Sequence, residues 1–266
     1  MSDRRPIGIF DSGLGGLTVL RQIHDLLPRE PLVYLGDTAR VPYGSKSEKT
    51  VLKYSENNIR YLERHDVKMV VVACNTASAY VIPLLKKHSV PVIGVIEGGV
   101  EAAVKNSGGA IGVIGTEATI NSKAYEFAIN RKLPGAKVTS KACPLFVPLV
   151  EEGWIDSPVT RAVASEYLEM FYEKVDTLVL GCTHYPLLKK TIGQVLGTAT
   201  ILVDSARETA LKVKEALGQY DLFTDDYMNV GSIEIVVTDS PGRSLRVAKR
   251  MLGYRKIEKI GYVDII

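Results

Sequence analysis

Short apolar runs alternate with amphipathic segments along the whole chain. The runs are rich in Val, Ile and Leu and do not alternate with polar residues, which is typical of strands covered on both faces. They comprise residues 7–10, 32–36, 69–74, 92–96, 110–115, 177–182, 201–204 and 233–239. The segments between them carry apolar residues at helical spacing, as at Val51, Tyr54, Ile59 and Leu62. This succession predicts an α/β fold with parallel sheets and right-handed crossovers.

The sequence also contains two crude half-copies of itself. The segment IGIFDSG at Ile7 is similar to IGVIGT at Ile111, 104 residues later, and Cys182 follows Cys74 by 108 residues in a similar setting. We therefore expect two pseudo-symmetric α/β domains with the active site in the cleft between them. The first comprises residues 1–97 and the second residues 98–205, and we expect the remaining segment, 206–266, to pack back onto one of the two. The pair Gly98 and Gly99 is the predicted crossing point, because glycine permits backbone angles that other residues resist.

Two cysteines occupy matching places in the two halves. Cys74 and Cys182 each follow a strand directly, so we expect both thiols at the carboxyl edge of a parallel sheet, where open α/β folds bind ligands. Two opposed thiol bases across one cleft are the prediction. The start of a helix at Cys74 also predicts a thiol pKa below its free value of about 8.5. Cys143 has no polar neighbours, and we assign it to the core.

Polar loops follow the first two predicted strands. The glycine-rich segment 10–16, with Asp11 and Ser12, predicts a tight turn that opens a helix and attracts an anion. A dinucleotide loop is the competing interpretation, but Thr18 stands where its third glycine belongs. After the second strand, the turn 37–45 offers the hydroxyls of Tyr43 and Ser45.

Composition and spacing exclude several other classes. The net charge of +3 is small and the charges are interspersed, so we expect no nucleic-acid partner. No apolar stretch is long enough for a signal peptide or a membrane span, so we expect a cytoplasmic protein without membrane contact. A zinc site at Cys74, Cys182 and His184 would lack the usual ligand spacing. A Cys-His hydrolase would leave one of the two cysteines unexplained.

At these residues the chain resembles the cofactor-independent aspartate/glutamate racemases. The resemblance rests on IFDSGLGGL, DTARVPYGS, VVACNTASA, LVLGCTHYPLL and VDSA, which are spread from the first strand to Asp204. GCTHYP is similar to the glutamate-specific members, because aspartate-specific members usually carry a different residue at the position of His184. The family implies two pseudo-symmetric α/β domains with the active site between them, a C-terminal segment, 206–266, that returns to the first domain (1–97), no cofactor and a homodimer.

The resemblance also implies roles for individual residues. Cys74 would act on D-glutamate with the assistance of Asp11, and Cys182 on L-glutamate with the assistance of His184. The implied substrate-binding residues are Asp11, Ser12, Tyr43, Gly44, Ser45, Asn75, Thr76, Glu151, Thr183 and His184. In the family, D-glutamate supplies peptidoglycan synthesis in the cell wall. Two alternatives stay open at this point: a two-lobed small-molecule binding protein, and a racemase of another acidic substrate such as aspartate.

Overall fold

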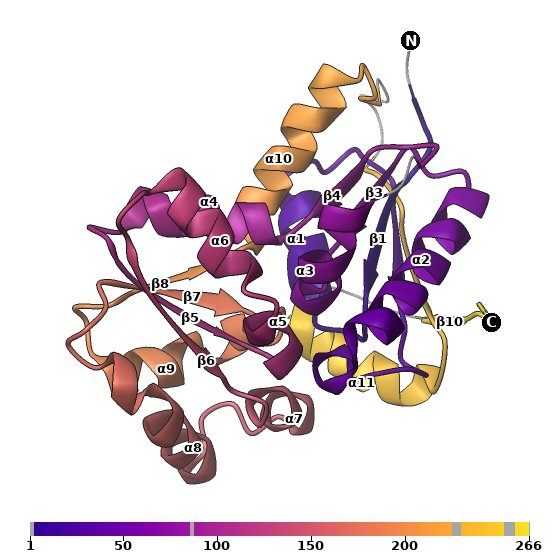
Figure 1. Ribbon diagram of the computed structural model, residues 1–266. Helices are drawn as coiled ribbons and strands as arrows, with labels where there is room; N and C mark the ends of the chain where they lie inside the picture. The colour runs from indigo at the N-terminus through magenta and orange to yellow at the C-terminus, as the bar shows by residue number, and fades with distance from the viewer. Residues whose placement is uncertain (1–2, 86–87, 225–229, 253–258, 266) are drawn as a thin grey trace.

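The computed structural model describes residues 3–85, 88–224, 230–252 and 259–265, and these contain two parallel sheets (Figure 1). The first sheet comprises β1 (Ile7–Asp11), β2 (Leu32–Gly36), β3 (Met69–Val72), β4 (Val92–Gly94), β9 (Ile233–Val237) and β10 (Gly261–Tyr262). The second comprises β5 (Ala110–Gly115), β6 (Lys137–Ala142), β7 (Thr177–Gly181) and β8 (Ile201–Asp204). The predicted class of two parallel-sheet α/β units is confirmed.

Helices connect the strands and cover the faces of both sheets. The α-helices are α1 (Leu17–Leu26), α2 (Glu48–Arg64), α3 (Asn75–Val81), α4 (Ile96–Asn106), α5 (Glu117–Asn121), α6 (Ala124–Lys132), α7 (Phe146–Glu152), α8 (Pro158–Leu168), α9 (Lys189–Leu196), α10 (Ala206–Gln219) and α11 (Pro241–Leu252). Short 3₁₀ helices are η1 (Tyr43–Ser45), η2 (Ile82–Leu84), η3 (Glu169–Phe171) and η4 (Tyr185–Leu188). In Figure 1, α4 and α6 lie on one face of the second sheet, and α8 and α9 on the other.

Four neighbouring strands of the first sheet, β2-β1-β3-β4, repeat the order of the second sheet, β6-β5-β7-β8, which gives the internal repeat its structural meaning. The first sheet runs β10-β9-β2-β1-β3-β4 and the second β6-β5-β7-β8, so β1 and β5 take equivalent central positions. On either side of each central strand the chain winds in opposite directions, and this topological switch point is where open α/β sheets bind ligands. Strands β1, β2, β3 and β7 are buried throughout, as their apolar sequences require.

The chain after β8 returns to the first sheet. Helix α10 packs against α1 and α4, β9 pairs with β2, and β10 pairs with β9. The domain limits near residues 97 and 205 stay a prediction. The reason we gave for Gly98 and Gly99 is wrong, because both lie inside α4. A Cβ at Gly98 would lie 2.7 Å from Thr209 Oγ1, and one at Gly99 would lie 2.6 Å from the Tyr125 hydroxyl. The chain does pass from the first sheet to the second through α4, between β4 and β5, and within this helix the two glycines allow close packing.

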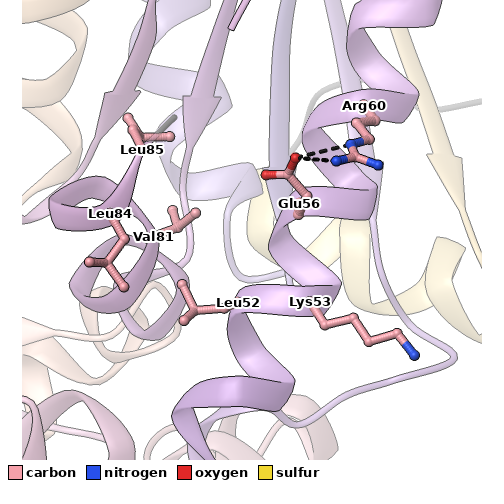
Figure 2. A pocket seen from close by; sticks show the side chains of 7 residues that line it. All are labelled: Leu52, Lys53, Glu56, Arg60, Val81, Leu84 and Leu85. Carbon is pink, nitrogen blue, oxygen red and sulfur yellow. Dashed lines mark hydrogen bonds and ion pairs between the residues drawn. The ribbon is translucent and has the colours of Figure 1, made fainter. Parts of the chain in front are cut away.

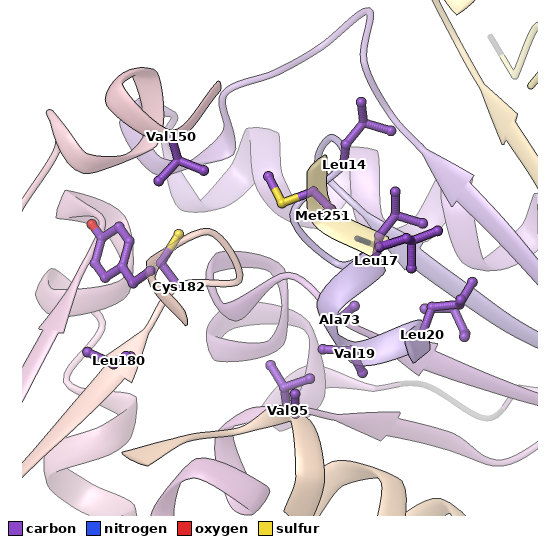
Figure 3. Close-up of a cluster of buried hydrophobic side chains, with 14 of the residues drawn as sticks. Leu14, Leu17, Val19, Leu20, Ala73, Val95, Val150, Leu180, Cys182 and Met251 are labelled. Atoms are coloured by element: carbon purple, nitrogen blue, oxygen red, sulfur yellow. The ribbon is translucent and has the colours of Figure 1, made fainter. Parts of the chain in front are cut away.

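One apolar cluster joins the two sheets. It contains Leu14 and Leu17 beside β1, Leu180 and Cys182 from β7 and the residue after it, and Met251 of α11 (Figure 3). Cys143 belongs to the same cluster, which confirms its assignment to the core. Burial therefore holds the edges of the two sheets against each other. Among the described residues, no helix is long and apolar enough to cross a membrane.

Candidate active site

The carboxyl edges of both sheets open into one small cavity of about 30 Å³. Both Cys74 and Cys182 line it, so the two thiols that end equivalent strands meet in the same space. A volume of this size accommodates one or two water molecules. The lining residues are Ser12, Val41, Pro42, Tyr43, Gly44, Cys74, Asn75, Thr76, Thr116, Val147, Gly181, Cys182, Thr183 and His184.

Cys74 caps the start of α3 next to Ser12, the first residue of the β1–α1 loop. Its Sγ accepts a hydrogen bond from the Ala77 amide at 3.5 Å and lies 3.5 Å from Ser12 Oγ. Burial, and then the negative charge of Asp11, raise the pKa of the Cys74 thiol to about 12. The predicted lowering of this pKa is wrong, because one helix N–H does not offset the loss of water and a nearby carboxylate.

Cys182 has a cationic neighbour. Its Sγ lies 3.9 Å from His184 Nδ1, and His184 Nε2 forms an ion pair with Glu151 Oε1 at 3.3 Å. Burial alone would lower the pKa of His184, but the interactions with Cys182, Glu151 and Asp11 raise it to about 10. The imidazole is therefore protonated at neutral pH, and Cys182 faces a positive charge.

Asp11 ends β1 and is fully buried. Its Oδ2 accepts from the Gly13 amide at 2.9 Å, and its Oδ1 accepts from Thr183 Oγ1 at 3.4 Å. Burial raises the pKa of Asp11, while the charge of His184 and backbone N–H groups act in the opposite direction. The carboxylate thus links the two sides of the cavity: the β1–α1 loop beside Cys74, and Thr183 beside Cys182. We call these sides the Cys74 wall and the Cys182 wall. A Cβ at Gly15 would collide with Thr183 and His184, so glycine is required where the two walls approach.

A group of three threonine hydroxyls closes one side of the cavity. Thr76 of α3 contacts Thr116 at 2.8 Å and Thr119 at 3.0 Å, and Thr116 contacts Thr119 at 2.9 Å. Our reading of the sequence missed Thr116. The internal repeat contained the signal for it, because the 104-residue offset that relates Ile7 to Ile111 also relates Ser12 to Thr116.

Four predicted residues do not present a side-chain polar group to the cavity as expected, and the first is Asp11, which lies outside the lining. The Tyr43 ring lines it, but the hydroxyl donates to Asp37 and accepts from Asn58 Nδ2 at 3.0 Å. Ser45 is exposed and lies outside the lining. Glu151 is also outside the lining and reaches the site through His184.

A larger hollow of about 330 Å³ lies between α2 and the α3–η2 segment (Figure 2). Leu52, Val81 and Leu84 contribute apolar walls, and Glu56 pairs with Arg60 at 2.9 Å. Neither cysteine nor histidine is among the described residues that line it. Within the described ranges, no three His, Cys, Asp or Glu side chains are grouped so that they could hold a metal ion.

The two thiols line one cavity at equivalent sheet edges, which is where open α/β folds bind their ligands. Residues 7–213 match the model of the Asp/Glu/Hydantoin racemase family, and the chain belongs to this family. It is a racemase, an isomerase.

Similar proteins carry the same fold over their full length. The chain is 52% identical over 252 residues to a glutamate racemase of Geobacter metallireducens, covering 94% of this chain and 93% of that protein. It matches the crystal structure of Francisella tularensis glutamate racemase in complex with D-glutamate with a TM-score of 0.91 and 36% identity, over 99% and 98% of the two chains. Glutamate racemase from Thermus thermophilus in complex with β-chloro-D-alanine matches with a TM-score of 0.89 and 43% identity, over 99% and 98%.

Proposed function

We propose that this racemase interconverts L-glutamate and D-glutamate by a two-base mechanism. The observation that carries the proposal is that Cys74 and Cys182 line one cavity from equivalent sheet edges. Inversion at a carbon needs a base on one face and an acid on the other, because a single base would return the proton to its original side. Support for glutamate as substrate comes from the glutamate racemases that the chain resembles over nearly its full length.

The electrostatics of the two walls suggest how the resting site is charged. The pKa of Cys74, raised to about 12, keeps this residue as a thiol that can donate a proton. The protonated His184 places a positive charge 3.9 Å from the sulfur of Cys182, and we assign Cys182 as the base for L-glutamate. In this state Cys182 removes the α-proton of L-glutamate and Cys74 protonates the opposite face, giving D-glutamate. The reverse reaction starts with the two thiols in exchanged protonation states.

Small polar groups around the thiols supply the substrate contacts. Ser12, Asn75, Thr76 and Thr183 present hydroxyls or amides at the cavity, and we assign them, with Gly44, to the substrate carboxylates and ammonium. The Asn75 Nδ2 atom is buried and has no hydrogen-bond partner among the described residues. Glutamate is larger than a cavity of about 30 Å³, so binding requires the two walls to separate.

The remaining parts of the proposal concern the cellular setting. We assign the protein to the cytoplasm as a homodimer that needs no cofactor, with D-glutamate supplied to peptidoglycan synthesis. Aspartate is the alternative substrate, and competition between the two amino acids decides between them.

Three single variants test the mechanism, with racemisation of L-glutamate followed by circular dichroism. Cys74→Ala and Cys182→Ala should each abolish turnover, because each direction needs both sulfurs. Cys143→Ala is the matched control: it removes a buried sulfur outside the cavity lining, and turnover should persist. A Cys182→Ala protein that racemises glutamate near the wild-type rate would refute the two-base assignment.

A further inference from the structure

The side chain of Tyr125 links α6, which packs beside the second sheet, to Asn75, the residue after Cys74. It lies on α6 with 2% of its surface exposed, and its hydroxyl donates to Asn75 Oδ1 at 2.7 Å. Asn75 directly follows Cys74 and lines the cavity, whereas Tyr125 does not line it. The tyrosine hydroxyl therefore acts on the site through the asparagine.

Two glycines make room for the Tyr125 ring. A Cβ at Gly99 of α4 would lie 2.6 Å from the Tyr125 hydroxyl, and a Cβ at Gly181 of β7 would lie 3.1 Å from the ring carbon Cε2. A side chain at Gly99 would push the ring out of place, because contacts below about 3.0 Å do not occur in close-packed interiors, and a Cβ at Gly181 would press tightly on the ring edge. The ring thus occupies a slot formed by α4, α6 and β7.

The chemistry of the hydroxyl fixes the orientation of the Asn75 amide. Burial, followed by the charges of Asp204 and Cys182, raises the pKa of Tyr125, so the hydroxyl keeps its proton. A buried O–H needs an acceptor, and Asn75 Oδ1 supplies it. With Oδ1 directed at Tyr125, the Nδ2 group is directed elsewhere. This Nδ2 is buried and unpartnered within the described structure, which leaves two N–H donors for a ligand.

We propose that Tyr125 is a positioning residue that holds the Asn75 amide with Nδ2 directed at a carboxylate of the bound amino acid. The inference rests on the proposed function, and it adds a residue outside the cavity to the substrate-binding machinery. Asn75 lies on α3, beside the first sheet, and Tyr125 lies on α6, beside the second sheet. The Nδ2 group of Asn75 is therefore held in this orientation only when α3 and α6 are in contact.

Tyr125→Phe removes the hydroxyl and keeps the ring in its slot. The KM for L-glutamate and for D-glutamate should both rise about 10-fold, the cost of a poorly oriented hydrogen bond to a charged group. The value of kcat should change less than about 3-fold, since neither thiol is touched. Equal changes in both directions are expected because the two enantiomers share their carboxylates.

Tyr80→Phe is the matched control. Its hydroxyl also crosses between the two sheets' helices, donating to the Ala118 carbonyl oxygen at 3.0 Å, but it does not contact Asn75. Its KM should stay within about 2-fold of wild type. In an Asn75→Ala background, Tyr125→Phe should add no further loss. A full additional loss in that background, or an unchanged KM in Tyr125→Phe, overturns the proposal.

An NMR measurement made without substrate distinguishes the positioning role of Tyr125 from the proposed racemase activity. The side-chain NH₂ resonances of Asn75, identified by their loss in Asn75→Ala, should shift or broaden in Tyr125→Phe and stay unchanged in Tyr80→Phe. Absence of glutamate turnover in the wild type would refute the proposed function alone. Unchanged Asn75 resonances in Tyr125→Phe would refute the positioning role whatever the substrate.

Discussion

Replacing Glu151 by Gln tests whether this residue controls the charge of His184. Glu151 Oε1 lies 3.3 Å from His184 Nε2, and the pKa of His184 is raised to about 10. Gln keeps the size and polarity of the side chain but removes its charge. The pKa of His184 should therefore fall, while the contributions of Cys182 and Asp11 keep it above the ordinary value of about 6.5.

The size of the fall follows from the geometry. Opposite charges 3.3 Å apart attract by about 5 kcal/mol at an effective dielectric constant of 20. The Glu151 side chain is 24% exposed, so solvent screening reduces this to about 2 kcal/mol. That energy corresponds to a fall of about 1.5 pH units.

The raised pKa of His184 also makes the free energy of unfolding depend on pH. A histidine that binds its proton more tightly when folded contributes stability that is complete below about pH 6.5. This stability is lost as the pH rises through the folded pKa of about 10. In Glu151→Gln the contribution should be smaller, and it should be lost at lower pH.

Titration of the His184 ring resonances by NMR measures the fall directly, and the high-pH limb of kcat/KM should move with it. Glu152→Gln is the control, since Glu152 is the next residue, 68% exposed, and pairs only loosely with Arg243 at 3.9 Å. A His184 pKa that changes by less than about 0.3 pH units in Glu151→Gln would refute the reasoning, as would an equal change in Glu152→Gln.

Two further predictions concern the reaction and the fold. In heavy water, D-glutamate formed from L-glutamate should carry deuterium at the α-carbon, while the remaining L-glutamate should stay largely unlabelled early in the reaction. Mass spectrometry of the separated enantiomers measures both labels. Equal labelling of substrate and product would indicate a single base. Lys68→Met should lower the free energy of unfolding in urea by about 3–5 kcal/mol, because it leaves Glu30 buried without its partner at 2.5 Å. The double variant Lys68→Met/Glu30→Gln should recover part of this loss, and a double variant less stable than Lys68→Met would contradict the account.

The fold and the meeting of the two thiols were predictable from local patterns. Apolar runs without alternation identify buried parallel strands, and the residues after them must come to the carboxyl edge. The same logic places Cys74 and Cys182 without knowledge of any contact. It failed for the pKa of Cys74, since a sequence shows the start of a helix but not the burial of the sulfur or the distance to a carboxylate.

Side-chain partners distant in sequence could not be predicted. Tyr43 was expected to offer its hydroxyl to a ligand, but Asp37 and Asn58 engage it. Tyr125 has no local signal, because its role depends on an asparagine 50 residues earlier in the chain. Thr116 was within reach of sequence reasoning, since the repeat relates it to Ser12.

The small volume between the two cysteines has a consequence for stereochemical fidelity. The closed cavity of about 30 Å³ admits only one or two water molecules, so in the proposed reaction a glutamate that parts the walls fills the space it opens and few competing acids surround the carbanion. Bulk water would protonate either face of the carbanion without preference. Under the proposed two-base mechanism, with solvent largely excluded, the product depends on which sulfur holds a proton when the carbanion forms, and the lifetime of the carbanion is set by the protein groups around it rather than by water.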